Sequence, residues 1–182
     1  MNKLFAIVSA LLVSASPSLA MSVEERQQHV GLVQSLENVN VSVLVNEPKH
    51  CVTDGPNKYY GAFIPSERLV IICQTNKTVM DGDVVPFSLE DLDTLRHEAH
   101  HVVQDCLDGK LDGYMITLFE EDQLNMFLAN FPQEYVDNVK RVYGEWGASP
   151  EDIMLELEAF AVAAEVPAST ISSAVTKFCT GK

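Results

Sequence analysis

The sequence predicts an α+β domain: a small, mainly antiparallel sheet followed by a helical C-terminal half. Short β-branched runs bounded by turn residues lie in the first half of the chain. Longer segments with apolar residues at helical spacing follow from residue 88 onwards. Four cysteines form an even set, which adds the expectation that disulfides stabilise the domain.

The first part of the chain combines one helical segment with three expected strands. Residues 22–36 carry apolar side chains at helical spacing among Glu, Arg and Gln, so a helix is expected there. Strands are expected at residues 41–45, 59–64 and 68–73, which are rich in β-branched or aromatic residues. Residues 65–67 supply the turn between the last two strands.

The second half is expected to be helical, with clear start signals. Ser88 followed by Asp91 resembles a capping box, so a helix is expected from there to Cys106. Ser149 followed by Pro150 is a second strong helix start. Further helices are expected at residues 116–130, 133–143, 149–165 and 169–178.

The first twenty residues are interpreted as a secretory signal peptide. Lys3 gives a positive start, residues 4–13 form an apolar run, and small residues lead to an expected cleavage after Ala20. The apolar run is about half of the ~20 residues that a membrane span needs, so no membrane association is expected after removal of the signal. Residues 21–182 then form one domain of a secreted or periplasmic protein.

The charge of the chain argues against two classes of partner. The formal net charge is −14, and it becomes −15 without Lys3 of the signal peptide. A chain this acidic is repelled by phosphate backbones and by anionic lipid. Neither nucleic acid nor a membrane surface is therefore expected as a partner.

The cysteines are expected to pair as Cys51–Cys73 and Cys106–Cys179. The first pair flanks the expected hairpin, and the second pair lies at the ends of two expected helices. Disulfides are typical of exported proteins. The chain contains no Cys-x-x-Cys pair, which argues against a zinc ribbon or a thioredoxin-like site.

The segment His97-Glu98-Ala99-His100-His101 carries the chemistry. His97 and His101 are four residues apart, so on a helix both imidazoles stand on one face and can share a tetrahedral zinc ion. Glu98 lies one step round the helix, where it can take a proton from an attacking water. The spacing is the His-Glu-x-x-His motif of zinc metallopeptidases, in the helical context that the motif requires.

Other polar residues are candidates for supporting roles. Gln104 and Asp105 follow the motif by one turn and are candidates to orient a ligand imidazole. His100 is expected to pack or to face solvent. Three phenols are candidates to stabilise the oxyanion of a tetrahedral intermediate: Tyr114, Tyr135 and Tyr143.

The chain resembles the zincin metallopeptidases of the gluzincin branch, typified by thermolysin. The metzincin branch would need Gly at position 104 and His at position 107, where this chain has Gln104 and Leu107. Gluzincins take their third zinc ligand from a Glu on a later helix. The resemblance to a Glu-x-x-Ala segment implies Glu156 as this ligand, and Glu158 is the alternative.

The resemblance also implies a function, which is an expectation at this point. The expected protein is an exported zinc (Zn²⁺) metallopeptidase that cleaves peptide or protein substrates by zinc-activated water, with Glu98 as general base. In this family an edge strand above the motif helix holds extended substrate, and residues 68–73 are the candidate for that strand. Phe160 replaces the Asp or Asn often found four residues after the ligand Glu. That departure keeps open an alternative, a non-catalytic zincin-like binding or inhibitor module.

Overall fold

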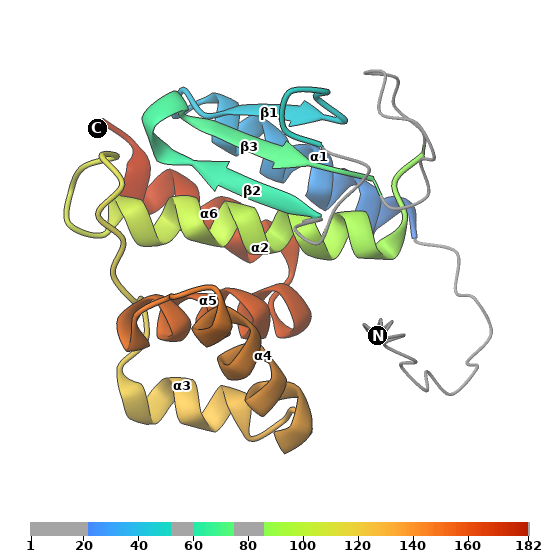
Figure 1. Cartoon of the computed structure of the whole chain (residues 1–182). Coiled ribbons are helices and arrows are strands. Elements are labelled where there is room, and N and C mark those ends of the chain that lie inside the picture. The colour runs from blue at the N-terminus through green and yellow to red at the C-terminus, as the bar shows by residue number, and fades with distance from the viewer. Residues whose placement is uncertain (1–21, 52–59, 75–85, 182) are drawn as a thin grey trace.

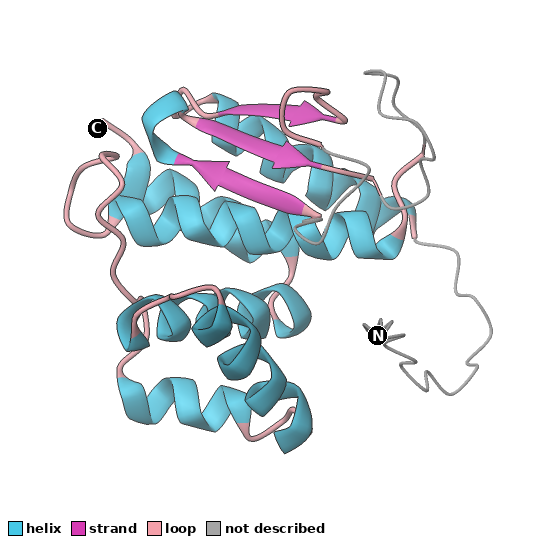
Figure 2. Cartoon of the chain, viewed as in Figure 1, coloured by secondary structure: helices cyan, strands magenta, loops and turns pink. Residues whose placement is uncertain are grey.

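The fold has a sheet with three flanking helices above a second group of three helices (Figure 1). The structure is a computed structural model, and it describes residues 22–51, 60–74 and 86–181. Helices account for most of this part of the chain, and the strands form one small sheet (Figure 2). The expected α+β class is therefore confirmed. The expected signal peptide lies outside the described residues.

The sheet is mixed rather than mainly antiparallel. Its strands are β1 (Ser42–Val45), β2 (Gly61–Ile64) and β3 (Leu69–Ile72), in the order β1-β3-β2. β1 pairs in parallel with β3, and β2 pairs antiparallel with it. A 3-10 turn over Pro65–Glu67 reverses the chain between β2 and β3, and Arg68 completes the turn with a left-handed φ of 49°.

The expectation that residues 68–73 form the substrate-binding edge is wrong. β3 is the central strand, with a partner on each side, so its backbone groups have no free edge. All four of its side chains are buried, which is typical of a strand covered on both faces. The edge strand next to the motif helix is β2, which contacts that helix directly.

Three helices pack with the sheet around the main hydrophobic core. They are α1 (Val23–Glu37), α2 (Leu89–Cys106) and α6 (Ala168–Cys179). Ser88 caps α2 through the expected capping box with Asp91, and α2 then runs under the sheet (Figure 1). The core between these elements includes Leu32, Leu36, Val70, Ile72, Leu95, Val102, Ile171 and Val175. α2 is thus buried on both sides, which fixes the direction of its side chains.

The lower group consists of α3 (Glu121–Leu128), α4 (Gln133–Glu145) and α5 (Pro150–Glu165). α5 begins at Ser149 as expected, and it packs on both α2 and α4. A second apolar cluster joins the lower helices, with Val136, Val139 and Leu157 at its centre. α5 therefore connects the lower helices to the motif helix.

The helix expected over residues 116–130 is wrong in its first part, because α3 begins only at Glu121. The backbone amides of the preceding residues are committed to other partners. Ile116 N donates to the carbonyl of Gln104, while Leu118 N and Phe119 N donate to the carboxylate of Glu158. These tertiary hydrogen bonds hold residues 116–119 in a non-helical path that a local helical pattern cannot reveal.

Both expected disulfides are present. Cys51 is bonded to Cys73 beside the sheet, and Cys106 is bonded to Cys179. The second bond joins the C-terminal ends of α2 and α6 across 73 residues of chain. A loop of that length stabilises the folded state by about 4 kcal/mol in the chain-entropy model. Among the described residues, no helix is both long and apolar enough to cross a membrane.

Candidate metal centre

The motif helix holds its polar residues in an enclosed position. Every residue of α2 from His97 to Cys106 is buried, between the sheet on one side and α5 and α6 on the other. A buried run of this kind containing three imidazoles and two carboxylates is unusual, because buried polar groups need partners. The partners of these polar groups therefore indicate the role of the helix.

Three side chains converge at the face of α2 that meets α5. The Nε2 atoms of His97 and His101 lie 3.0 Å apart. Glu156 Oε2 lies 3.2 Å from Nε2 of His97, and Glu156 Oε1 lies 3.6 Å from Nε2 of His101. Ligands held tetrahedrally at about 2.0–2.1 Å from zinc lie about 3.3 Å from one another, and the three distances bracket that value.

The tautomer of His101 suits metal ligation. Gln104 Nε2 donates to the carbonyl of Leu155 at 3.1 Å and to Glu158 Oε1 at 2.9 Å, and both of these groups only accept. The amide oxygen of Gln104 must then face His101 Nδ1, which lies 2.7 Å away. Nδ1 of His101 therefore carries the proton, and in the neutral ring Nε2 offers its lone pair toward His97 and Glu156.

Two polar atoms of this cluster lack hydrogen-bond partners in the described structure. Glu156 Oε2 and His97 Nδ1 are buried, and neither has a hydrogen-bond partner of good geometry among the described residues. Burial opposes ionisation of Glu156, but its contacts with His101 and His97 hold the pKa of that carboxyl well below its usual range. An ionised carboxylate beside two Nε2 atoms is the donor set that zinc prefers, so these residues fit the ion.

The same contacts act on His101. Burial lowers the pKa of this imidazole, but contact with Glu156 and the charges of Glu156 and Glu98 raise it to about 9. In the metal-free protein a proton therefore occupies this cluster at neutral pH. Ligation would require the loss of this proton, so metal binding at this site would release a proton.

Glu98 lies beside the convergence point without contacting either imidazole as closely as Glu156 does. Ligand-capable atoms of His97, Glu98 and His101 all lie within 4.8 Å of one another. Burial raises the pKa of Glu98, and the neighbouring imidazoles and the Phe63 backbone amide offset this in part. A carboxylate whose pKa is raised toward neutrality is suited to accept a proton.

The edge strand β2 approaches Glu98 through a glycine. A Cβ on Gly61 would lie 2.5 Å from Thr94 Cγ2, 2.9 Å from the carbonyl oxygen of Ile71 and 3.1 Å from Glu98 Cγ. Only glycine allows β2 to lie this close to α2. Neither Gly61 nor Phe63 was identified from the sequence, although a glycine within a strand pattern is a sign of close backbone approach.

Glu158, the alternative ligand, belongs to a different cluster. Its side chain is fully buried and faces away from the two motif imidazoles. Its oxygens pair with His100 Nε2 at 2.7 Å, with Gln104 Nε2, and with the amides of Leu118 and Phe119. The Glu158 carboxylate already accepts from four protein donors, three at Oε1 and one at Oε2, and contacts neither His97 nor His101, so the geometry favours Glu156 as third ligand.

Phe160 occupies the place where the resemblance leads one to expect a polar residue. Its ring centroid lies 4.4 Å from that of His97, so an apolar side chain rather than an acceptor packs against that imidazole. This contact accounts for the unpartnered Nδ1 of His97. The two ligand imidazoles are thus held differently, His101 by a hydrogen bond and His97 by packing.

The remaining candidates divide clearly. Asp105 Oδ1 accepts from the amides of Asp112 and Gly113, so Asp105 shapes the loop after α2 and orients no imidazole. Tyr114 is exposed. Burial and then the charge of Glu156 raise the pKa of Tyr143, so this phenol is the one that interacts with the cluster. It therefore remains a protonated donor.

Comparison with known proteins identifies a family. A family model described as a domain of unknown function (DUF8637) matches residues 22–180, nearly all of the chain. No curated protein and no solved structure matches the chain. Inference about function rests on the geometry of the site.

Proposed function

We propose that this chain, which belongs to that family, is a zinc-dependent hydrolase that cleaves peptide bonds. The observation that carries the proposal is the convergence of His97, His101 and Glu156 at the distances of a tetrahedral ligand set. Three protein ligands leave a fourth position open, as in catalytic rather than structural zinc sites. Glu98 lies next to these ligands, on the same helix as His97 and His101.

Each group has a distinct chemical role in this proposal. A zinc ion held by His97, His101 and Glu156 would act as a Lewis acid toward water and toward the substrate carbonyl. Glu98 accepts a proton from the attacking water and returns it to the leaving amine. Tyr143, a protonated phenol near Glu156, donates a hydrogen bond to the developing oxyanion.

The edge strand supports the peptide specificity of the proposal. Among the described residues β2 is paired on one side only, by β3, and it lies against α2 at Glu98. An extended substrate can pair with the open side of such a strand, which presents its backbone to the catalytic carboxylate. The substrate class proposed is therefore peptide or protein.

The location proposed is secreted or periplasmic. Its support is the pair of formed disulfides and the signal-like composition of residues 1–20.

The test is the substitution Glu98→Gln in the purified protein. Glutamine keeps the size of the side chain but removes the proton acceptor, so hydrolysis of a peptide panel should fall by at least ~100-fold. Zinc content should stay at the wild-type value, because Glu98 is not a ligand. Glu165→Gln, an exposed position near the end of α5, is the control and should leave both unchanged. Equal hydrolysis by wild type and Glu98→Gln would refute the mechanism.

One observation favours a second function, a non-catalytic zincin-like binding or inhibitor module. Phe160 packs on His97, whose Nδ1 then lacks the acceptor that usually orients a zinc-ligating imidazole. The same experiment separates the two functions. A binding module would carry zinc in the wild type and would cleave no peptide in either form.

A further inference from the structure

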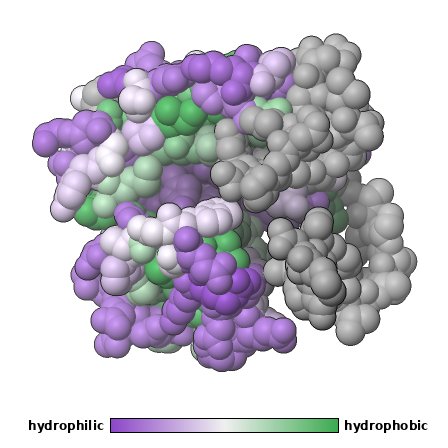
Figure 3. Space-filling model, in the orientation of Figure 1, coloured by the Kyte–Doolittle hydropathy of each residue, from purple (hydrophilic) through white to green (hydrophobic). Residues whose placement is uncertain are grey.

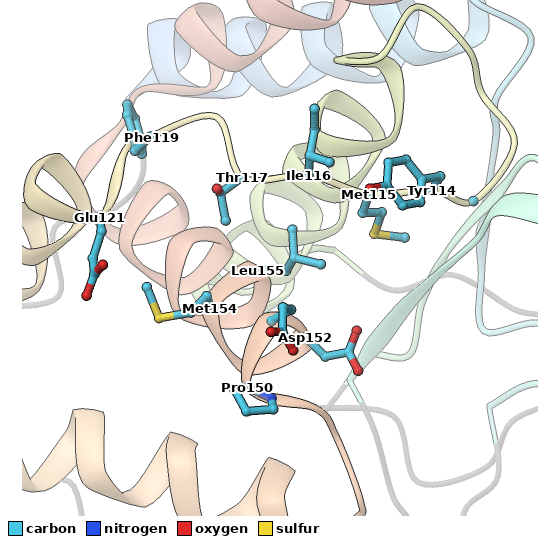
Figure 4. A pocket seen from close by; sticks show the side chains of 12 residues that line it. Tyr114, Met115, Ile116, Thr117, Phe119, Glu121, Pro150, Asp152, Met154 and Leu155 are labelled. Atoms are coloured by element: carbon cyan, nitrogen blue, oxygen red, sulfur yellow. The ribbon is translucent and has the colours of Figure 1, made fainter.

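A pocket of ≈ 760 Å³ lies between the segment that follows α2 and the start of α5 (Figure 4). One wall is the segment of residues 113–117 with Phe119 and Glu121, and the other wall is the first turns of α5 from Pro150 to Leu155. This volume is within the range of sites that bind small ligands or single side chains of a peptide.

Both walls of the pocket are anchored to the metal-centre residues. Leu155 is the residue before Glu156, and its carbonyl accepts a hydrogen bond from Gln104. Ile116 on the other wall donates its backbone amide to the carbonyl of Gln104. Gln104 in turn contacts His101. One wall of the pocket is therefore adjacent to Glu156 in the sequence, and the other wall is connected to His101 through Gln104.

The pocket also reaches the end of the edge strand. A Cβ on Gly113 would lie 3.3 Å from Cβ of Pro65, the residue that follows β2. A peptide paired with β2 would thus run from the catalytic carboxylate toward the pocket. A side chain close to the cleaved bond is the group placed to enter it.

The lining combines an apolar interior with a carboxylate rim. Met115, Ile116, Met154 and Leu155 supply flexible apolar surface, while Glu121, Glu151 and Asp152 are exposed at the rim. No lining residue is basic. Glu121 and Glu151 form no ion pair with any residue in the described ranges.

The charge of the whole chain adds to that of the rim. The described part of the face in Figure 3 is mainly hydrophilic, with apolar residues gathered in smaller patches. The chain as a whole has a net charge of −14, so its field favours cations over anions. An apolar stem that ends in a positive charge complements such a pocket, because long basic side chains bury their stems and keep their heads in water.

From this geometry we infer that the pocket binds the lysine or arginine side chain of a peptide substrate. The inference rests on the proposed function for the identity of the ligand as a peptide. Apolar contact with the methionines holds the stem, and the carboxylates of Glu121 and Glu151 attract the cationic group. The protein would then select basic positions for cleavage.

The experiment uses blocked peptides, acetylated and amidated, that differ only in one central residue: Lys, norleucine or Glu. Binding is measured by calorimetry with zinc-loaded Glu98→Gln protein, so that no peptide is consumed. The Lys peptide should bind about twofold to fivefold more tightly than the norleucine peptide, as for exposed ion pairs. The difference should shrink in 1 M salt, where charge interactions are screened within about 3 Å.

The variant Glu121→Gln/Glu151→Gln provides the decisive comparison. In this variant the Lys and norleucine peptides should bind with equal affinity, and the zinc content should not change. Glu165→Gln, on the same helix as Glu151, should preserve the difference in affinity. Equal binding of Lys and norleucine peptides by the parent protein, or no binding of any peptide, would overturn the inference. A protein that prefers Lys but carries no zinc would instead overturn the proposed function and leave the pocket assignment standing.

Discussion

Two carboxylates on α5, two residues apart, lie in opposite environments. Glu158 is fully buried and each of its oxygens is paired, with His100, Gln104 and two backbone amides. Glu156 is partly exposed and faces two imidazoles, and its Oε2 has no hydrogen-bond partner of good geometry in the described structure. One cluster is complete with protein groups alone, and the other is not.

This difference distinguishes a structural cluster from a ligand-binding one. A saturated buried network specifies how elements pack, and the Glu158 cluster joins α2, α5 and the segment before α3. A buried cluster whose nitrogen and oxygen lone pairs lack partners can bind a metal ion. Gln104 belongs to both clusters, because its amide nitrogen contacts Glu158 and its amide oxygen contacts His101.

The largest expected effect is on the incomplete cluster itself. Mutating both imidazoles, His97→Ala/His101→Ala, should reduce zinc from about one ion per chain to none, because each ring supplies one of three protein ligands. Elemental analysis of purified protein measures this, and His50→Ala is the control outside the motif. Full zinc occupancy in the double variant would contradict the assignment of the ligands.

The two carboxylates should respond in opposite ways. Glu158→Gln should lower the free energy of unfolding by about 3 kcal/mol, because it breaks a buried charged network. Glu156→Gln should lower that free energy less in the metal-free protein, because Glu156 is partly exposed, although its contacts with His101 and His97 stabilise the ionised carboxylate. Its zinc affinity should fall by more than the 10–100-fold that loss of an outer partner costs. Urea unfolding and competitive zinc titration measure the two quantities.

The reverse pattern would show that Glu158 is the ligand. A loss of zinc affinity in Glu158→Gln that matches the loss in Glu156→Gln would show that the two clusters act as one.

The shared residue should give a smaller effect. Gln104→Leu removes the acceptor for His101 Nδ1, so zinc affinity should fall by about 10–100-fold while both ligand imidazoles remain. Nitrogen NMR of His101 in the metal-free variant, recorded above the raised pKa of about 9 where the ring is neutral, should show that Nδ1 is no longer the preferred protonated atom. Gln133→Leu, at an exposed glutamine of α4, is the matched control. An unchanged tautomer in Gln104→Leu would refute the orienting role.

His29, a buried histidine outside both clusters, gives the smallest effect. His29 contacts the carbonyl oxygen of Glu25 through Nδ1, and its buried Nε2 has no partner among the described residues. Burial lowers the pKa of His29, and the contact with the Glu25 carbonyl offsets this in part. The folded state therefore favours the neutral ring. The contribution of His29 to stability is complete when the pH is above the pKa of the unfolded state, about 6.5. It is lost as the pH falls toward the lower pKa of the folded state.

Urea unfolding at several pH values between 7.5 and 5 (roughly spanning the histidine range) tests this expectation. The wild type should lose stability as pH falls, by at most ~1.4 kcal/mol per pH unit from this group. His29→Leu should show a smaller loss. A steeper loss in the variant than in the wild type would contradict the sign.

Much of the fold could be predicted because its signals are local. The capping boxes at Ser88 and Ser149 set the starts of α2 and α5, and the cysteine positions indicated both disulfides. The start of α3 could not be predicted, because Glu158, forty residues away, takes the amide of Leu118. The central place of β3 was missed, although the unbroken apolar run of Leu69–Ile72 is typical of a strand buried on both faces.

The site divides in the same way. The spacing of His97 and His101 predicted their shared face, because helical geometry alone fixes it. Spacing could not decide between Glu156 and Glu158, since their directions depend on how α5 packs against α2. The contact of Gln104 with His101 was predicted as a possibility, and the structure confirms it at 2.7 Å. The pocket could not be predicted, because its walls come from separate segments of the chain.

The most direct test of the central claim is to locate zinc in crystals of the zinc-loaded protein by anomalous diffraction at the zinc edge. A single peak is expected about 2.0–2.2 Å from Nε2 of His97, Nε2 of His101 and a carboxylate oxygen of Glu156, with Glu158 still bonded to His100. A peak on Glu158, or no peak between the two imidazoles, would contradict the assignment of the metal centre.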